Sequence, residues 1–167
     1  PPYTSSAASD VYKRQVCLPS RISLFTGMRP NSTGVHDLQT KFRVTIPEAV
    51  TLPQHFAAHG YETIGMGKVF HDEQWREWSQ WIDTNKLSGV KPYQNPETLE
   101  KIKALRQEAR QKGLKGSKLL RYTRGPAFEK ADVPDESYHD AAMTSCAIEA
   151  LKEVKDQAFF MVVGYKK

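Results

Sequence analysis

The chain has 167 residues, of which 39% are hydrophobic and 26% are charged, as is typical of a folded globular protein and not of a disordered one. This length suits one ordinary domain with a substantial core. The net charge of +5 is mild, two cysteines are too few for a disulfide framework, and no apolar run approaches the roughly 20 residues that a membrane span needs.

Much of the positive charge lies in one segment, KGLKGSKLLRYTR, at residues 112–124. A basic segment of this kind can bind nucleic acid or another anion. It contains Gly113 and Gly116 but only one aromatic residue, Tyr122. Single-strand binding uses several interleaved aromatic side chains for stacking. The pattern therefore favours a solvated loop, and a basic anion-binding or nucleic-acid-binding module is kept as a distant alternative.

The two ends of the chain do not read as the ends of a domain. Residues 1–14, PPYTSSAASDVYKR, lack an initiating methionine, an apolar signal-type core and any helix or strand pattern. They resemble a translated adaptor sequence, so we predict a non-native leader over residues 1–14. At the other end, AFFMVVGYKK indicates a buried strand with no helix after it. We therefore expect residues 15–167 to be part of a longer domain.

Capping residues and hydrophobic periodicity predict an α/β protein. Helices are expected over residues 20–26, 51–60, 95–113 and 141–155, from signals such as Thr51 and Asn95 as N-caps and Gly27, Gly60 and Gly113 as stops. Strands are expected over residues 61–66 and 158–164, and loops over residues 29–37 and 134–140. The helix-then-strand order predicts crossover connections, and the apolar run 158–164 predicts a strand buried on both faces of a parallel sheet.

The same patterns predict which side chains face inward. Inward-facing residues are expected to be Leu99, Ile102 and Leu105 in one helix, and Met143, Ala147, Ala150, Leu151 and Val154 in another. Cys146 lies on or beside the second stripe, where a small hydrophobic thiol needs no chemistry. Trp75, Trp78 and Trp81 repeat every three residues. We favour packing from one face of a helix or turn, with a sugar or cofactor platform as the alternative.

Cys17 is the candidate for chemistry. It begins the segment CLPSRISLFTGMR at the start of a predicted helix, where free N–H groups and the helix dipole favour negative charge. Arg21, four residues on, projects from the same face and can hold an anion through two N–H bonds. These features indicate a nucleophile at an oxyanion-binding helix start. A cysteine-dependent phosphatase fits this much, but Pro19 removes a backbone donor that such a phosphate loop would use.

CLPSRISLFTGMR resembles the signature of the sulfatase family, Cys-x-Pro-Ser-Arg followed by a Thr-Gly pair. The similarity continues over residues 16–71 and resumes over about 132–167, whereas residues 87–130 are not covered. The resemblance implies an alkaline-phosphatase-like α/β fold, mostly a parallel sheet flanked by helices and incomplete at both ends. Residues 15–167 would then be a partial N-terminal sulfatase catalytic domain that hydrolyses sulfate esters, in particular those of sulfated carbohydrates.

The resemblance also implies roles for single residues. Cys17 would be oxidised to formylglycine by a formylglycine-generating enzyme, and its hydrated aldehyde would supply the oxygen nucleophile and contact a metal ion, Ca²⁺. Arg21 would hold a hydroxyl group of that modified residue. Lys68 would bind sulfate oxygens and His71 would lie beside the nucleophile, both in the segment GKVFH that follows the strand predicted over residues 61–66. The position after a strand suits ligand binding in α/β sheets.

Other features of the site stay open at this stage. His36 and Asp37 are weaker candidates for the substrate pocket. The resemblance places most calcium ligands upstream of Cys17 or downstream of Lys167, so we expect the 167 residues alone to be inactive. It implies a periplasmic, secreted or lysosomal enzyme with a sulfate ester substrate and no nucleic-acid partner. Related enzymes that contain Cys-x-Pro-x-Arg hydrolyse phosphonate monoesters or phosphodiesters, and this activity is the alternative function. The spacing of the segment GKVFH favours a sulfatase.

Overall fold

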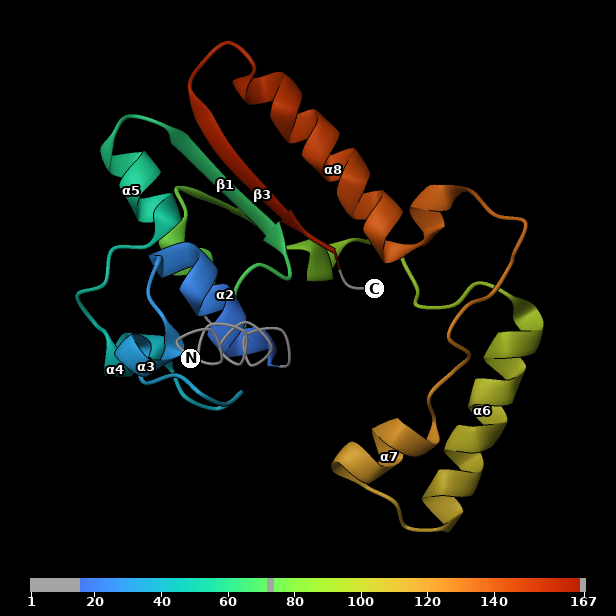
Figure 1. Cartoon of the computed structure of the whole chain (residues 1–167). Coiled ribbons are helices and arrows are strands. Elements are labelled where there is room, and N and C mark those ends of the chain that lie inside the picture. The colour runs from blue at the N-terminus through green and yellow to red at the C-terminus, as the bar shows by residue number, and fades with distance from the viewer. Residues whose placement is uncertain (1–15, 72–73, 166–167) are drawn as a thin grey trace, which may run out of the picture. The chain divides into compact units, whose positions relative to one another are not determined.

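The computed structural model describes residues 16–71 and 74–165, which form two compact units (Figure 1). The first unit runs to Asn85 and resumes at Ala147, and the second spans Lys86–Cys146. The leader predicted over residues 1–14 lies outside the described residues, so its non-native character stays a prediction.

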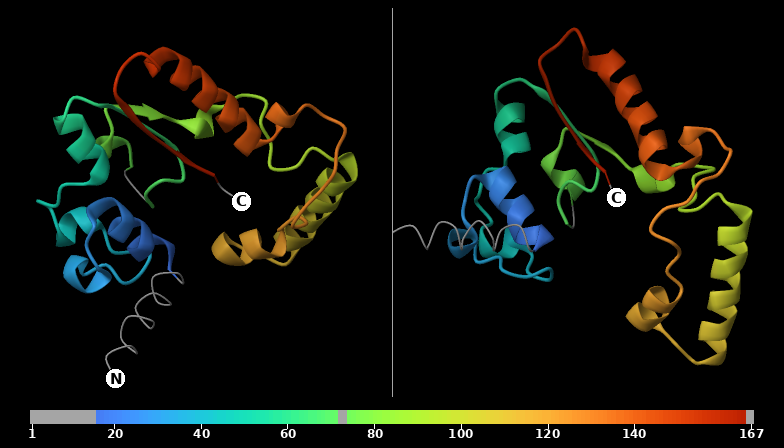
Figure 2. Two further views of the ribbon diagram at one scale, coloured as in Figure 1. Left: turned by 45° about the horizontal axis from the view of Figure 1, so that its top comes forward. Right: turned by 45° about the vertical axis from the view of Figure 1, so that its right-hand side comes forward.

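The first unit is built on a small parallel sheet, which confirms the predicted α/β class. Its strands are β1 (Glu62–Gly67), β2 (Gln80–Ile82) and β3 (Phe159–Gly164), in the order β2-β1-β3. Both neighbours run parallel to β1, with Ile64 opposite Gln80 on one side and Met161 on the other. Figure 1 shows β1 and β3 side by side, and Figure 2 gives two further views of the same ribbon.

The prediction that residues 158–164 are buried on both faces is wrong. Phe159 is 37% exposed and the rest of β3 is half-buried, whereas β1 is almost wholly buried. The reason is position, because in the described part of the chain β3 is an edge strand that pairs only with β1. An apolar run identifies a strand that can be buried, but it does not determine the strand's place in the sheet.

This unit also contains the helices α2 (Cys17–Thr26), α3 (Pro30–Thr33), α4 (Phe42–Thr45) and α5 (Leu52–Ala58) and the short 3-10 turn Gln74–Glu77. The 3-10 turn Thr84–Lys86 lies at its boundary with the second unit. The N-cap predicted for α5 is confirmed, since Thr51 and Gln54 form a reciprocal capping box, whereas the C-cap is His59, one residue before the predicted stop at Gly60. The loop predicted over residues 29–37 contains α3. Pro30 opens this short helix and Gly34 closes it at φ 69°, so the same residues that mark turns also delimit a helical turn.

The core of the first unit lies between α2, residues 68–71 after β1, and the segment 75–81 that contains the three tryptophans. Its buried members are Leu18, Ile22, Phe25, Val35, Phe42, Val69, Phe70 and Trp78. The packing interpretation of the tryptophans is confirmed for Trp78, which is 7% exposed, and for Trp81, which packs against this core from β2. The segment is therefore a 3-10 turn followed by a strand, and the side chain of Trp75 lies outside the described residues.

The second unit contains α6 (Pro96–Gln111), α7 (Gly116–Tyr122) and the 3-10 turn Asp135–Ser137. The predicted cap of α6 is confirmed, because Asn95 accepts hydrogen bonds from the backbone N–H groups of Glu97 and Thr98. Of the stripe predicted for α6, Ile102 is buried, Leu105 is half-buried and Leu99 is 37% exposed.

The solvated loop predicted for residues 112–124 is in fact mostly the helix α7. Lys112 donates to Glu108 Oε1 at 2.6 Å and to the Tyr122 hydroxyl at 2.7 Å, so it joins the end of α6 to the end of α7. Hydrogen bonding to Lys112 and, to a smaller extent, to Tyr122 lowers the pKa of Glu108. The two glycines that favoured a loop lie before or at the first residue of α7, where they do not interrupt it.

Helix α8 (His139–Val154) begins in the second unit and ends in the first. Its buried residues are Met143, Ala147, Ala150 and Val154, spaced by four, three and four residues as one helical stripe requires. The prediction that Leu151 faces inward is wrong, because it is 39% exposed and lies one residue off that stripe. Cys146 is a half-buried free thiol. Among the described residues, no helix is both long and apolar enough to cross a membrane.

Candidate active site

Cys17 is the first residue of α2, three residues earlier than the sequence predicted the helix to start. Leu18 and Ile22, 1% and 0% exposed, anchor the helix in the core and fix its N-terminus. The preceding residue, Val16, is extended and offers no side-chain cap, so the first turn presents uncapped backbone N–H groups beside a half-buried free thiol. Pro19, in the same turn, lacks such a donor, as expected.

Arg21 joins this helix start to the segment that follows β1. Its Nε donates to Cys17 Sγ at 3.0 Å, and its Nη1 donates to the carbonyl oxygens of Lys68 at 2.5 Å and Val69 at 2.8 Å. The planar guanidinium can bind acceptors in several directions at once, which an ammonium on a flexible stem does less well. The structure therefore brings Cys17, Arg21 and the backbone of Lys68 together, while the roles expected for these residues in catalysis stay predictions.

The backbone of Lys68 is held from the other side by β3. Its N–H donates to Gly164 O at 2.6 Å, and a Cβ built on Gly164 would lie 2.1 Å from Lys68 O. Only glycine permits this approach without moving the backbone. The carboxyl ends of β1 and β3 and the start of α2 thus meet at one edge of the parallel sheet, where ligands of α/β proteins bind.

The remaining candidates are less closely tied to Cys17. Lys68 is half-buried and His71 is exposed, and the residues between them, Val69 and Phe70, are 1% and 0% exposed and anchor the segment. His36 and Asp37 are both exposed. Hydrogen bonds from Thr40 and Gln39 lower the pKa of Asp37, whose Oδ1 accepts both backbone N–H groups and closes a turn. This contact gives Asp37 a structural role.

The described residues do not by themselves form a calcium site. Ca²⁺ takes six to eight oxygen ligands, whereas unmodified Cys17 offers sulfur. Across residues 16–71 and 74–165, no three His, Cys, Asp or Glu side chains cluster as metal ligands would. The described residues alone therefore do not supply the set of oxygen ligands that Ca²⁺ needs.

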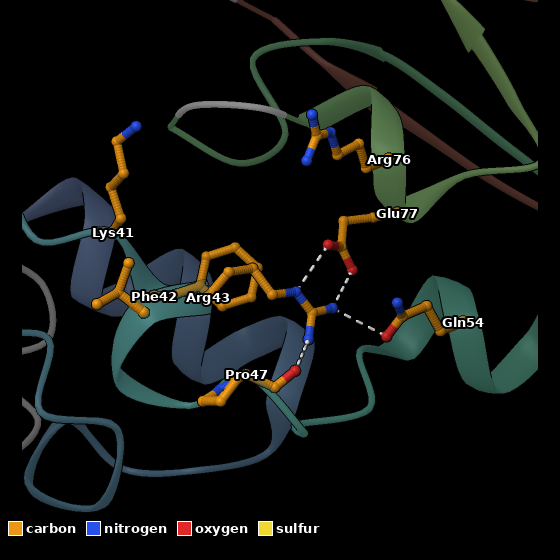
Figure 3. A pocket seen from close by; sticks show the side chains of 8 residues that line it. Lys41, Phe42, Arg43, Pro47, Gln54, Arg76 and Glu77 are labelled. Atoms are coloured by element: carbon orange, nitrogen blue, oxygen red, sulfur yellow. Dashed lines mark hydrogen bonds and ion pairs between the residues drawn. The ribbon is translucent and has the colours of Figure 1, made fainter.

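A surface pocket of about 560 Å³ lies elsewhere in the first unit and is shown in Figure 3. Glu77, with its side chain 5% exposed, accepts from Arg43 Nε at 3.0 Å and Nη2 at 2.5 Å and from Thr51 Oγ1 at 2.7 Å. Arg43 also binds Gln54 and two backbone carbonyls. This buried network fastens α4 and α5 to the turn Gln74–Glu77. Sequence reasoning missed it because 34 residues separate its two charges.

The sequence profile of the Sulfatase family matches residues 6–167. The chain belongs to the sulfatase family. It is 34% identical over 157 residues to iduronate 2-sulfatase of Mus musculus and 33% identical over 157 residues to that of Homo sapiens, covering 93% of this chain in each case. A sulfatase of Formosa agariphila is 38% identical over 63 residues, 34% of this chain and 12% of that protein.

Membership in the sulfatase family agrees with the α/β architecture of the first unit. The parallel sheet flanked by helices is consistent with the alkaline-phosphatase-like fold that the signature implied. The chain spans 27% of the length of the iduronate 2-sulfatases it matches. The segment CLPSRISLFTGMR, which first indicated a sulfatase, is the segment that forms α2 and its C-terminal turn.

Proposed function

We propose that this chain contributes the nucleophile and part of the sulfate pocket of an enzyme that hydrolyses sulfate esters, with Cys17 as the precursor of formylglycine. The observation that carries the proposal is the contact of Arg21 Nε with Cys17 Sγ at the start of α2, in a chain of the sulfatase family. A positive guanidinium beside residue 17 would stabilise the negative charge that develops on an attacking oxygen.

The proposed chemistry uses the two hydroxyl groups of the hydrated aldehyde. One hydroxyl loses its proton and attacks sulfur, the bond from sulfur to the ester oxygen breaks, and the alcohol leaves after taking up a proton. The second hydroxyl then loses its proton, re-forms the aldehyde and expels sulfate, and water hydrates the aldehyde again. A serine at this position has one hydroxyl and lacks the second route. Arg21 would steady the hydrate, Lys68 would bind sulfate oxygens, and His71 would lie beside the nucleophile.

The relatives support a finer assignment. The mammalian relatives are named iduronate 2-sulfatases, so we propose a sulfated carbohydrate as the substrate. A formylglycine-generating enzyme is the proposed maturation partner, and a periplasmic, secreted or lysosomal compartment is proposed by analogy. Calcium is proposed as the metal ion, with the mature residue 17 as one oxygen ligand and the others outside the described residues. The three relatives named above are sulfatases, which favours this function over phosphonate or phosphodiester hydrolysis.

The experiment that tests the proposal is mass spectrometry of the chain after co-expression with a formylglycine-generating enzyme. We expect the peptide containing Cys17 to lose about 18 Da, because the thiol carbon becomes an aldehyde carbon. Cys146, the other cysteine, is the internal control and should keep its mass. An unmodified Cys17 under conditions that convert a known substrate would contradict the proposal, as would equal conversion of both cysteines.

A further inference from the structure

A surface pocket of about 500 Å³ lies within the second unit, in a stretch that the Sulfatase profile also matches. Polar side chains that line it are Lys91, Tyr93, Lys103, Arg106, Gln107 and Arg110. Four of these are basic, and none of the lining residues is an aspartate or glutamate. A concave surface with charges of one sign focuses the electrostatic field and concentrates counter-ions.

Helix α6 places three of these basic residues on one face. Lys103, Arg106 and Arg110 are spaced by three and four residues, so their side chains are neighbours on the helix surface. Ile102, which is 7% exposed, also lines the pocket and anchors this part of the helix. The basic row is therefore presented by an ordered helix that Asn95 caps.

The fourth basic residue comes from a loop that is fixed from two directions. Lys91 N donates to Ser137 O at 3.3 Å, and Gln94 Nε2 donates to the same oxygen at 2.6 Å. Tyr93 donates to Pro126 O at 2.9 Å, and its ring covers Gly125, where a Cβ would lie 2.4 Å from the ring. The wall opposite α6 is thus ordered without any ligand.

Within the described residues, the side chains of Lys91, Arg106 and Arg110 form no hydrogen bond or ion pair. Lys103 is 3.6 Å from Glu100, and both of these side chains are well exposed, so this pair is weak. Four cations gathered around one hollow whose lining contains no carboxylate repel one another, and the exposed Glu100 offsets this only weakly. A bound polyanion would remove that repulsion, and the arginines could bind its oxyanion groups through two N–H bonds each.

We propose that this pocket is an accessory binding site for a sulfated saccharide chain, separate from the site at Cys17. The choice of ligand rests on the proposed function, because a polymer whose sulfate esters are substrates carries further sulfates that a cationic pocket can hold. A single aromatic residue, Tyr93, lines the pocket. That lining suits the face of one sugar ring, whereas single-stranded nucleic acid binds to a series of stacking platforms.

Titration of the complete chain with a dextran sulfate oligosaccharide in dilute buffer tests this site. Unsulfated dextran of the same length and a single-stranded oligothymidylate of similar charge serve as comparison ligands. We expect dextran sulfate to bind most tightly of the three, with an affinity that falls as salt is added. Absence of dextran sulfate binding, or tighter binding of the oligonucleotide, would overturn the proposal.

A pair of matched variants locates the binding. Arg106→Gln with Arg110→Gln is expected to weaken dextran sulfate binding about tenfold, because two charge-assisted contacts are lost. Lys118→Gln with Arg121→Gln removes the same charge from exposed positions of α7 outside the pocket, and is expected to change the affinity less than about twofold. Glutamine keeps helix propensity close to that of the original residues, and circular dichroism checks the helices.

If both double variants weakened dextran sulfate binding equally, net charge alone would cause the binding, and the proposed site would be wrong. The titration needs no conversion of Cys17. Failure of the accessory site therefore leaves the formylglycine proposal standing, and an unconverted Cys17 leaves the binding result standing.

Discussion

Replacing Arg21 with alanine is expected to lower the free energy of unfolding by about 3 kcal/mol, because a charged donor with three partners is lost. The carbonyl oxygens of Lys68 and Val69 would lose their guanidinium partner in a part-buried environment. Denaturant unfolding followed by circular dichroism measures the change. Arg21→Lys is expected to recover only part of the loss, since an ammonium cannot bind all three acceptors in the same geometry.

Arg29 provides the matched control for Arg21. It lies in the same segment, is exposed, and provides no side-chain cap for α3. Arg29→Ala is expected to change the free energy of unfolding by less than about 0.5 kcal/mol. If Arg21→Ala were no more destabilising than Arg29→Ala, the hydrogen bonds that connect α2 to the end of β1 would not hold in solution.

Replacing Gly164 with alanine is expected to destabilise the chain by about 3 kcal/mol or more. The added Cβ would lie 2.1 Å from Lys68 O and 2.3 Å from Lys68 C, which are backbone atoms that cannot rotate away. The substitution would also displace the carbonyl oxygen of Lys68 that Arg21 binds. The loss of this hydrogen bond would destabilise the start of α2 as well. Thermal or denaturant unfolding of the variant measures this cost.

The control for Gly164 is the same substitution at a glycine with open space. Gly60 has φ 81°, nothing lies within 4 Å of its added Cβ, and it precedes β1 in the same unit. Gly60→Ala is expected to cost about 1 kcal/mol from left-handed backbone strain alone. Similar costs at the two positions would show that β3 and the segment after β1 do not approach as closely as described.

Local chemistry explains which parts of this fold the sequence can predict. Thr51 caps α5 and Asn95 caps α6 through bonds to residues within the next three positions, so a short window of sequence contains the whole signal. Gly27 ends α2 in the left-handed conformation for the same local reason. A parallel sheet also followed from the strand patterns, whereas the pairing of β3 with β1 and the exposure of β3 did not.

Contacts between distant segments account for what the sequence left out. The approach of Cys17 to Arg21 is a matter of helical spacing, but the two carbonyls that fix Arg21 are 47 and 48 residues away. The network of Glu77, the strand β2 and the pairing of Lys112 with Tyr122 likewise depend on the folded chain. Leu151 was misplaced because a hydrophobic residue one position off the stripe resembles a member of it.

The measurement that tests the central claim most directly is labelling of the folded, converted chain with an aminooxy probe, followed by peptide mass spectrometry. Cys17 is partly exposed at the start of α2, so its aldehyde is expected to react in the native state, with one label at residue 17 and none in Cys17→Ala. A folded chain that stays unlabelled although its digest contains the aldehyde, or a label at any other residue, would contradict the account.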